Sequence, residues 1–190
     1  QNVSHLQRVF GKAGLMMWEK ANGIDNSPVE PYHERKSIST EHTFERDVTN
    51  ISSLDELLIA MTEQLTFILR NEGKYSCCIA IKIRYSNFDT YTQQKAIPPT
   101  HADHVLFPLI KKLFREAYQK GKAIRLIGVR LSQLTEESVQ PGLFDNHEKT
   151  AKLYSVLDEM NNRYGKKTVS RAATLGISGR DFDPEGKTKP

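Results

Sequence analysis

The chain has 190 residues, of which 38% are hydrophobic and 26% are charged. This composition supports a packed globular core and excludes a chain that is disordered throughout. The formal net charge of +4 permits a polyanionic partner without requiring one, and no apolar run approaches the roughly 18 residues that a membrane-spanning helix needs.

The first residues predict a helix followed by a linker. Residues 3–21 carry a rough apolar stripe at helical spacing, which Gly11 and Gly14 weaken. Residues 22–34, NGIDNSPVEPYHE, contain two prolines, an Asn-Gly pair and few apolar side chains, as is typical of a linker. Because the chain begins with Gln1 rather than Met, we expect it to be a fragment or a processed chain.

The next two segments predict a strand and a long helix. Residues 35–45 place Ile38 and Phe44 on one parity and polar side chains on the other, which indicates a strand with one polar face. Residues 52–73 predict a helix that begins with a capping box of Ser53 and Glu56 and ends at Gly73. Its apolar face consists of Leu54, Leu57, Leu58, Met61, Leu65, Ile68 and Leu69.

Three more strands and a second helix follow. Residues 75–85 alternate between isoleucines and small or cationic side chains, residues 90–97 predict the partner strand across a turn at 86–89, and residues 123–134 predict the last strand. A helix is expected within 102–120, with Pro108 in its first turns or at a bend. Its expected buried face is Val105, Leu109, Leu113, Ala117 and Phe114.

The predicted fold class is α+β, with the β-α-β-β-α-β order of ferredoxin-like domains and both helices on one face of a four-stranded sheet. The other face would carry Arg35, Ser37, Lys82 and Arg84. Cations neutralise phosphates and small hydroxyls allow a backbone to approach closely, so this pattern favours sequence-independent binding to a duplex backbone. A merely solvated sheet face explains the pattern equally well.

The stretch VQPGLFDN, residues 139–146, places Leu143 and Phe144 in a loop between charged segments. Such a pair either inserts into a partner or packs back on its own domain. Residues 147–164 then predict an amphipathic helix, and residues 177–190 are expected to be disordered. The apolar stripe of this helix is Leu153, Val156, Leu157, Met160 and Tyr164.

No catalytic or metal-binding constellation is predicted. His101 and His104 have i, i+3 spacing without another His or Cys nearby, and the D-x-D at 181–183 lies in the charged tail. The sequence contains neither G-x-G-x-x-G after a strand nor G-x-x-x-x-G-K-[ST], which are the Gly-rich motifs that bind phosphates. Cys77 and Cys78 are neighbours that point to opposite faces of a strand, so we expect free thiols and a reducing, cytoplasmic location.

Several segments together resemble Y-family translesion DNA polymerases of the DNA polymerase IV type. FGKAGLMMWEKANGIDNSPV is similar to the end of the thumb domain of that family. ERKSISTEHTF, IKIRYSNFDTYTQQ, PPTHAD and IRLIGVRLSQL are similar to its little finger domain. QPGLF resembles the clamp-binding pentapeptide of bacterial members, and residues 148–176 resemble the tail that follows it. The resemblance spans residues 5–176, and the order of the segments makes it specific.

The resemblance implies a domain organisation. The expected parts are the end of the thumb at 1–22, a linker at 23–34, the little finger at 35–138, the clamp-binding peptide at 139–146 and a helical tail at 147–176.

The resemblance also implies a role in error-prone bypass of DNA damage, in the bacterial cytoplasm at the nucleoid. Mg²⁺ is expected for the parent enzyme, held by palm-domain carboxylates. Because those motifs do not occur in this sequence, we expect the chain alone to be inactive, with no cofactor, metal ligand or catalytic residue of its own.

The implied partners are duplex primer-template DNA and the bacterial sliding clamp, with no membrane. The little finger of the family lies in the major groove and contacts both backbones. Carried over to this sequence, its DNA-binding residues are Arg35, Lys36, Ser37, Ser39, Thr43, Lys82, Arg84, Ser86, Arg125 and Arg130. The implied clamp-binding residues are Gln140, Leu143 and Phe144, and Pro141 departs from the commoner Leu.

Two other readings fit the order of the elements. The first is an RRM-like RNA-binding module, but the aromatic pattern that such modules use for base stacking does not occur on the central strands. The second is a ferredoxin-like interaction domain without catalysis. It accounts neither for the Gln140–Phe144 peptide nor for the cationic strand face.

Overall fold

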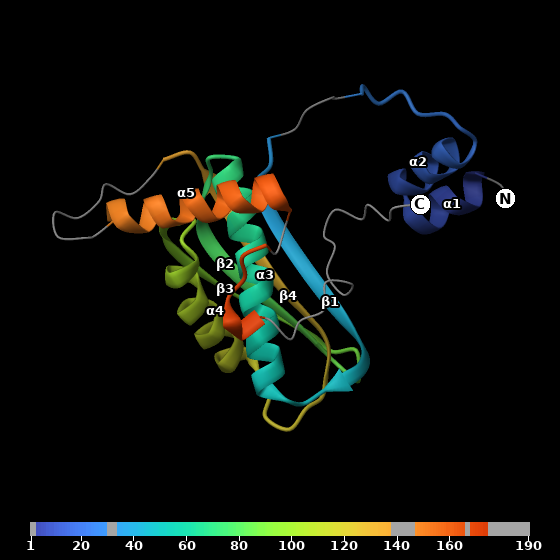
Figure 1. Ribbon diagram of the computed structural model, residues 1–190. Helices are drawn as coiled ribbons and strands as arrows, with labels where there is room; N and C mark the ends of the chain where they lie inside the picture. Colours follow the sequence, from blue (N-terminus) through green and yellow to red (C-terminus); the bar gives the residue numbers. More distant parts are fainter. Residues whose placement is uncertain (1–2, 30–33, 138–146, 166–167, 175–190) are drawn as a thin grey trace. The chain divides into compact units, whose positions relative to one another are not determined.

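The computed structural model describes residues 3–29, 34–137, 147–165 and 168–174. The chain divides into two compact units, residues 1–34 and 35–190. Figure 1 labels their helices and strands. Among the described helices, none is long and apolar enough to cross a membrane.

The first unit holds two short helices instead of the single helix predicted for residues 3–21. Helix α1 spans Val3–Phe10 and α2 spans Lys12–Ala21. Gly11 separates them, because its φ of 59° lies in the left-handed region that glycine adopts without steric cost. Gly14 lets α2 approach the Leu6 carbonyl of α1, since a Cβ on Gly14 would collide with that oxygen. The prediction of one continuous helix was therefore wrong.

The second unit confirms the predicted α+β fold. Its elements are β1 (Ser37–Val48), α3 (Ile51–Asn71), β2 (Tyr75–Tyr85), β3 (Thr90–Thr100), α4 (Asp103–Ala117) and β4 (Ile124–Thr135). Helix α5 (His147–Tyr164) and the short 3₁₀ helix η1 (Ala172–Thr174) follow them. The strands form one antiparallel sheet in the order β1-β4-β2-β3. Each β-α-β connection therefore skips one strand, which is the split arrangement expected from the sequence.

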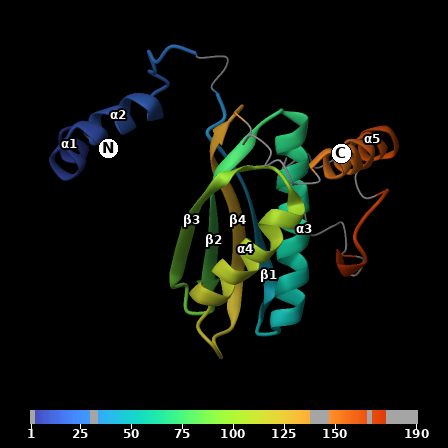
Figure 2. The ribbon, with the colours of Figure 1, turned by 90° about the vertical axis from the view of Figure 1, so that its left-hand side faces the viewer.

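Both α3 and α4 lie on the same side of the sheet, as Figure 2 shows. Alternation along the strands separates the two faces, so that Ile79, Ile81 and Ile83 are fully buried beneath the helices. The core also contains Ile38, Leu54, Leu57, Leu58, Met61, Leu65, Leu69, Tyr85, Leu106, Ile110, Leu113, Phe114, Ile124, Ile127, Val129 and Leu131. The strand parity and the apolar face of α3 are as predicted, except that Ile68 is only partly buried.

The start of α3 differs from the prediction. Asn50 is the N-cap, and its Oδ1 accepts a hydrogen bond from the Ser52 amide at 3.0 Å. The Ser53 hydroxyl instead donates to the Asn50 carbonyl at 2.9 Å. The predicted capping box of Ser53 and Glu56 was wrong because Asn50, which is as good an N-cap as Ser, starts the helix earlier.

The buried face of α4 also differs from the prediction. Leu106 and Ile110 are buried beside Leu113 and Phe114, whereas Val105 is 39% exposed. The apolar residues of this helix fit two neighbouring stripes, and the structure rotates the helix toward the stripe that includes Leu106.

Helix α5 occupies the predicted residues, but its buried face is rotated away from part of the predicted apolar stripe. Leu153, Val156 and Tyr164 are each more than half exposed, and Tyr154 is the buried aromatic residue, at 5% exposure. Because Leu157 and Met160 are half-buried, the docking face of α5 includes only part of the predicted apolar stripe.

Candidate nucleic-acid interface

The sheet face opposite α3 and α4, called the open face below, is covered by none of the helices described for the second unit. Strand pairing arranges its side chains in four rows across β1, β4, β2 and β3. The rows are Ser37–Ser132–Cys78–Ala96, Ser39–Arg130–Ala80–Gln94, Glu41–Gly128–Lys82–Thr92 and Thr43–Leu126–Arg84–Thr90. Six of the predicted DNA-binding residues, Ser37, Ser39, Thr43, Lys82, Arg84 and Arg130, thus share one surface.

The three cations of the open face are held by neighbours in the sheet. The Arg130 guanidinium donates to the Ser37 hydroxyl at 2.9 Å, and Arg84 Nε donates to the Thr90 hydroxyl at 2.9 Å. Both contacts are exposed and use neutral acceptors, so both guanidinium groups keep their full positive charge. The third cation, Lys82, makes a salt bridge with Glu41 at 2.8 Å.

Two small residues lie at the middle of the open face. Gly128 and Ala80 occupy the two central strands next to Lys82 and Arg130. A Cβ on Gly128 would come within 2.8 Å of the Glu41 side chain. Gly128 therefore leaves space for the Glu41 side chain at the centre of the face, and cations and hydroxyls surround that position.

Arg35, Lys36 and Ser86 lie outside the four rows. Arg35 precedes β1 and donates to Glu72, at the end of α3, at 2.9 Å. Lys36 is exposed directly before β1, and Ser86 is exposed directly after β2, where its amide bonds to the Ala123 carbonyl. These residues occupy the ends of the strands and not the middle of the sheet.

Arg125 lies where β4 shifts its register against β2, between the pairs Arg84–Leu126 and Tyr85–Ile124. Its guanidinium is 5.0 Å from the centre of the Phe88 ring and 3.8 Å from Asp47. Phe88 has a φ of 67° and is 64% exposed in the turn between β2 and β3. The irregularity in β4 therefore brings Arg125 to an exposed aromatic ring at the edge of the open face.

The predicted clamp-binding residues Gln140, Leu143 and Phe144 lie outside the described residues. The flanking described elements are the end of β4 and helix α5.

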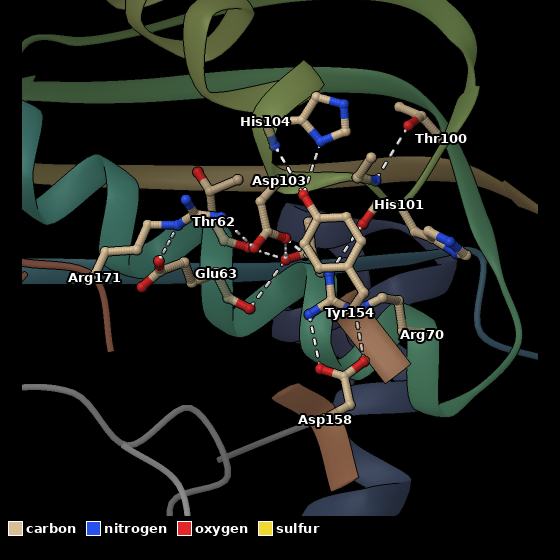
Figure 3. Close-up of polar contacts among 12 residues, drawn as sticks. Thr62, Glu63, Arg70, Thr100, His101, Asp103, His104, Tyr154, Asp158 and Arg171 are labelled. Carbon is tan, nitrogen blue, oxygen red and sulfur yellow. Dashed lines mark hydrogen bonds and ion pairs between the residues drawn. The ribbon is translucent and has the colours of Figure 1, made fainter. Parts of the chain in front are cut away.

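A buried polar network, which the sequence analysis did not predict, joins α5 to α3 and α4 (Figure 3). Arg70 of α3 donates to both carboxylate oxygens of Asp158 in α5, at 2.6 and 2.9 Å. It also donates to Asp103, at the start of α4, at 2.8 Å. The Tyr154 ring lies 4.6 Å from the Arg70 guanidinium. Burial alone would lower the pKa of Arg70, but the hydrogen bonds and charges of Asp158 and Asp103 outweigh burial and raise it.

The same network extends to His104 at the start of α4 and to Arg171 before η1. The Tyr154 hydroxyl lies 2.8 Å from Nδ1 of His104. Arg171, which directly precedes η1, contacts Asp103 at 3.3 Å and Glu63 at 2.7 Å. Burial raises the pKa of Glu63, and the charge of Arg171 partly opposes that effect. The network therefore attaches α5 and the residues before η1 to the helical layer through polar contacts, while Leu153, Val156 and Tyr164 of α5 stay exposed.

The two histidines with metal-like spacing make different contacts. The His101 ring stacks on Tyr75 at 4.3 Å, and the His104 ring meets Tyr154. Burial, followed by the charge of Arg70, lowers the pKa of His101. Within the described residues, no group of three or more potential ligands is arranged to hold a metal ion.

Residues 35–143, which include the whole sheet, match the impB/mucB/samB family C-terminal domain. The chain belongs to this family. The match confirms the resemblance to Y-family polymerases and favours it over the RRM-like and the ferredoxin-like interaction readings.

Bacterial relatives agree with the family assignment. The chain is 36% identical over 182 residues to DNA polymerase IV of Clostridium acetobutylicum, covering 92% of this chain and 45% of that protein. It is 31% identical over 175 residues to DNA polymerase IV of Opitutus terrae, covering 90% of this chain and 45% of that protein. It is 30% identical over 190 residues to DNA polymerase IV 2 of Bacillus subtilis, covering 96% of this chain and 46% of that protein. The chain therefore spans less than half the length of these relatives.

Proposed function

We propose that the second unit binds duplex primer-template DNA through its open face, as the DNA-gripping part of an error-prone translesion polymerase. The observation that carries the proposal is the grouping of Arg130, Lys82 and Arg84 in three successive rows of one uncovered sheet face. Cations among small hydroxyls provide phosphate contacts and no base readout, so the binding is independent of sequence.

The spacing of the cations suits a nucleic-acid backbone. Arg130 and Arg84 lie two rows apart on adjacent strands, which corresponds to a separation of about 14 Å for strands with a rise of about 3.4 Å per residue. Each DNA strand carries one phosphate per roughly 3.4 Å of helix axis. The face therefore spans about four nucleotide steps, enough for several phosphates. We propose that it contacts them across the major groove.

The test is a titration of a labelled primer-template duplex with the full chain, by fluorescence anisotropy at several salt concentrations. Arg84→Gln and Arg130→Gln together should reduce the slope of log K against log salt by about 1.8, since each phosphate contact contributes about 0.9. The matched control is Lys111→Gln with Lys112→Gln, which removes two charges from α4 on the helix side. A slope near zero in the wild type, or equal slopes in both double variants, would overturn the proposal.

For the full-length protein we propose DNA-directed DNA synthesis past damaged bases, in the bacterial cytoplasm at the nucleoid. Mg²⁺ would be held by palm-domain carboxylates. Residues 35–143 match the C-terminal domain of the family. In this proposal they supply DNA contacts, and the reacting groups belong to the palm domain.

We further propose that Gln140, Leu143 and Phe144 bind the bacterial sliding clamp and recruit the enzyme to it. An extended peptide with an apolar anchor pair is a recurring recognition mode. Truncating an anchor residue costs about 2 kcal/mol or more, which is about a 30-fold loss of affinity. Calorimetry with a bacterial clamp should show this loss for Phe144→Ala but not for Phe88→Ala, which truncates an exposed Phe in the turn between β2 and β3. Equal affinities for the two variants would contradict the clamp assignment.

A further inference from the structure

Glu41 lies on β1, the strand at one edge of the sheet, and its side chain extends over Gly128 of β4 toward the centre of the open face. It lies in the same row as Gly128 and Lys82, between the rows that hold Arg130 and Arg84. Among the residues that the strand register places in the four rows, all of them described, Glu41 is the only acidic one. A carboxylate at this position faces the surface that phosphates would approach.

The Glu41 side chain reaches across β4 to Lys82. The Lys82 ammonium donates to both carboxylate oxygens, at 2.8 and 3.0 Å. Gly128 of β4 lies between the two residues, and a Cβ there would come within 2.8 Å of Glu41 Cγ. The absence of a side chain at Gly128 therefore provides the space in which the salt bridge crosses the sheet.

This arrangement divides the cations of the open face into two kinds. Arg130 and Arg84 contact neutral hydroxyls and keep their net charge, whereas Lys82 is paired with a charge of the opposite sign. Both members of the pair are partly exposed, at 32% for Lys82 and 41% for Glu41, so a phosphate can reach Lys82 in competition with Glu41. Glu41 also repels any phosphate that lies over the centre of the face.

We propose that Glu41 sets the affinity of the open face by masking Lys82, so that the domain holds duplex DNA more weakly than its cations alone would allow. This inference rests on the proposed DNA-binding function. A weaker grip shortens the residence of the domain at one position, since affinity differences among variants of one interface appear mostly in the off-rate. Glu41 is thus a determinant of release, and Arg130 and Arg84 are determinants of binding.

The first experiment compares wild type with Glu41→Gln in the same duplex titration. The amide keeps the size of the side chain and removes its charge. Because one more effective phosphate contact steepens the salt slope by about 0.9, the affinity should rise about 5- to 10-fold at 0.1 M salt. Glu116→Gln removes the same charge from α4 on the helix side and serves as the control. It should change the affinity less than about 2-fold, because surface charges beyond about 10 Å are screened at this salt concentration.

The second experiment removes Lys82 in both backgrounds. Lys82→Gln should cost little affinity in the wild type, where Glu41 neutralises the lysine, and about 5- to 10-fold in the Glu41→Gln background. Equal costs in both backgrounds, or an unchanged affinity of Glu41→Gln, would overturn the masking role. If the wild type itself binds duplex without salt dependence, the proposed function fails instead, so the two failures are distinguishable. Circular dichroism melts of each variant verify that it is folded.

Discussion

Replacing Arg70 by Met should detach α5 from the helical layer and destabilise the second unit. The Arg70 side chain is 11% exposed, and its two carboxylate partners are 7% and 13% exposed. Removing it deprives Asp158 of both hydrogen bonds described above, while Asp103 retains Thr66 and Arg171. Breaking a buried ion pair from one side costs about 3–5 kcal/mol, because an uncompensated charge stays in the interior.

The assay is urea unfolding followed by circular dichroism, together with hydrogen exchange of the α5 amides. Arg35→Met is the matched control, because Arg35 pairs with Glu72 at 2.9 Å but is 51% exposed. An exposed pair contributes less than about 1 kcal/mol. If Arg70→Met costs no more free energy of unfolding than Arg35→Met and the α5 amides exchange at the wild-type rate, Arg70 does not hold α5 on the helical layer.

Three further changes test other parts of the structure. Replacing a glycine by alanine within a helix usually stabilises it by about 0.5–1 kcal/mol. In Gly14→Ala, however, the added Cβ would collide with the Leu6 carbonyl. Amide exchange in α1 and α2 should therefore become at least about 10-fold faster. The pKa of His101 in the folded state lies below the ordinary 6.5. As the pH falls below 6.5, the unfolded chain therefore binds more protons than the folded chain does, and the free energy of unfolding decreases. His101→Gln should make melting curves between pH 7 and pH 5 less pH-dependent, and an unchanged dependence would contradict the assignment. Gly128→Ala should displace Glu41 and raise duplex affinity about 2- to 5-fold in anisotropy, whereas unchanged affinity would show that the salt bridge tolerates a Cβ.

The sheet and its two covering helices were predictable because the periodicity of apolar side chains along the sequence determined them. Along β2, isoleucines at alternate positions face the helices, and Lys82 and Arg84 face the other way, as strand geometry requires. The apolar face of α3 was equally clear, since seven of its residues recur at helical spacing on one side. The placement of Lys82 and Arg84 on one face followed from strand parity and the order of the elements, whereas Arg130 was expected there only through the family resemblance.

The remaining features depend on contacts between distant residues, which local patterns do not encode. Helix α5 has an apolar stripe at Leu153 and Val156, and periodicity alone predicts that this stripe is buried. The structure instead buries Tyr154 and half-buries Asp158, because Arg70 offers a charged partner from 88 positions away in the sequence. The proposed masking role of Glu41 could not be predicted from local sequence patterns either, since only the strand register places Glu41 in the same row as Lys82.

An NMR titration of the labelled full chain with a primer-template duplex determines whether duplex DNA lies on the open face. Amide shifts should change mainly in the strand residues of the four rows, with the largest changes around Arg130, Lys82 and Arg84. Changes concentrated in α3 and α4, with the strands unaffected, would contradict the binding of duplex DNA to the open face.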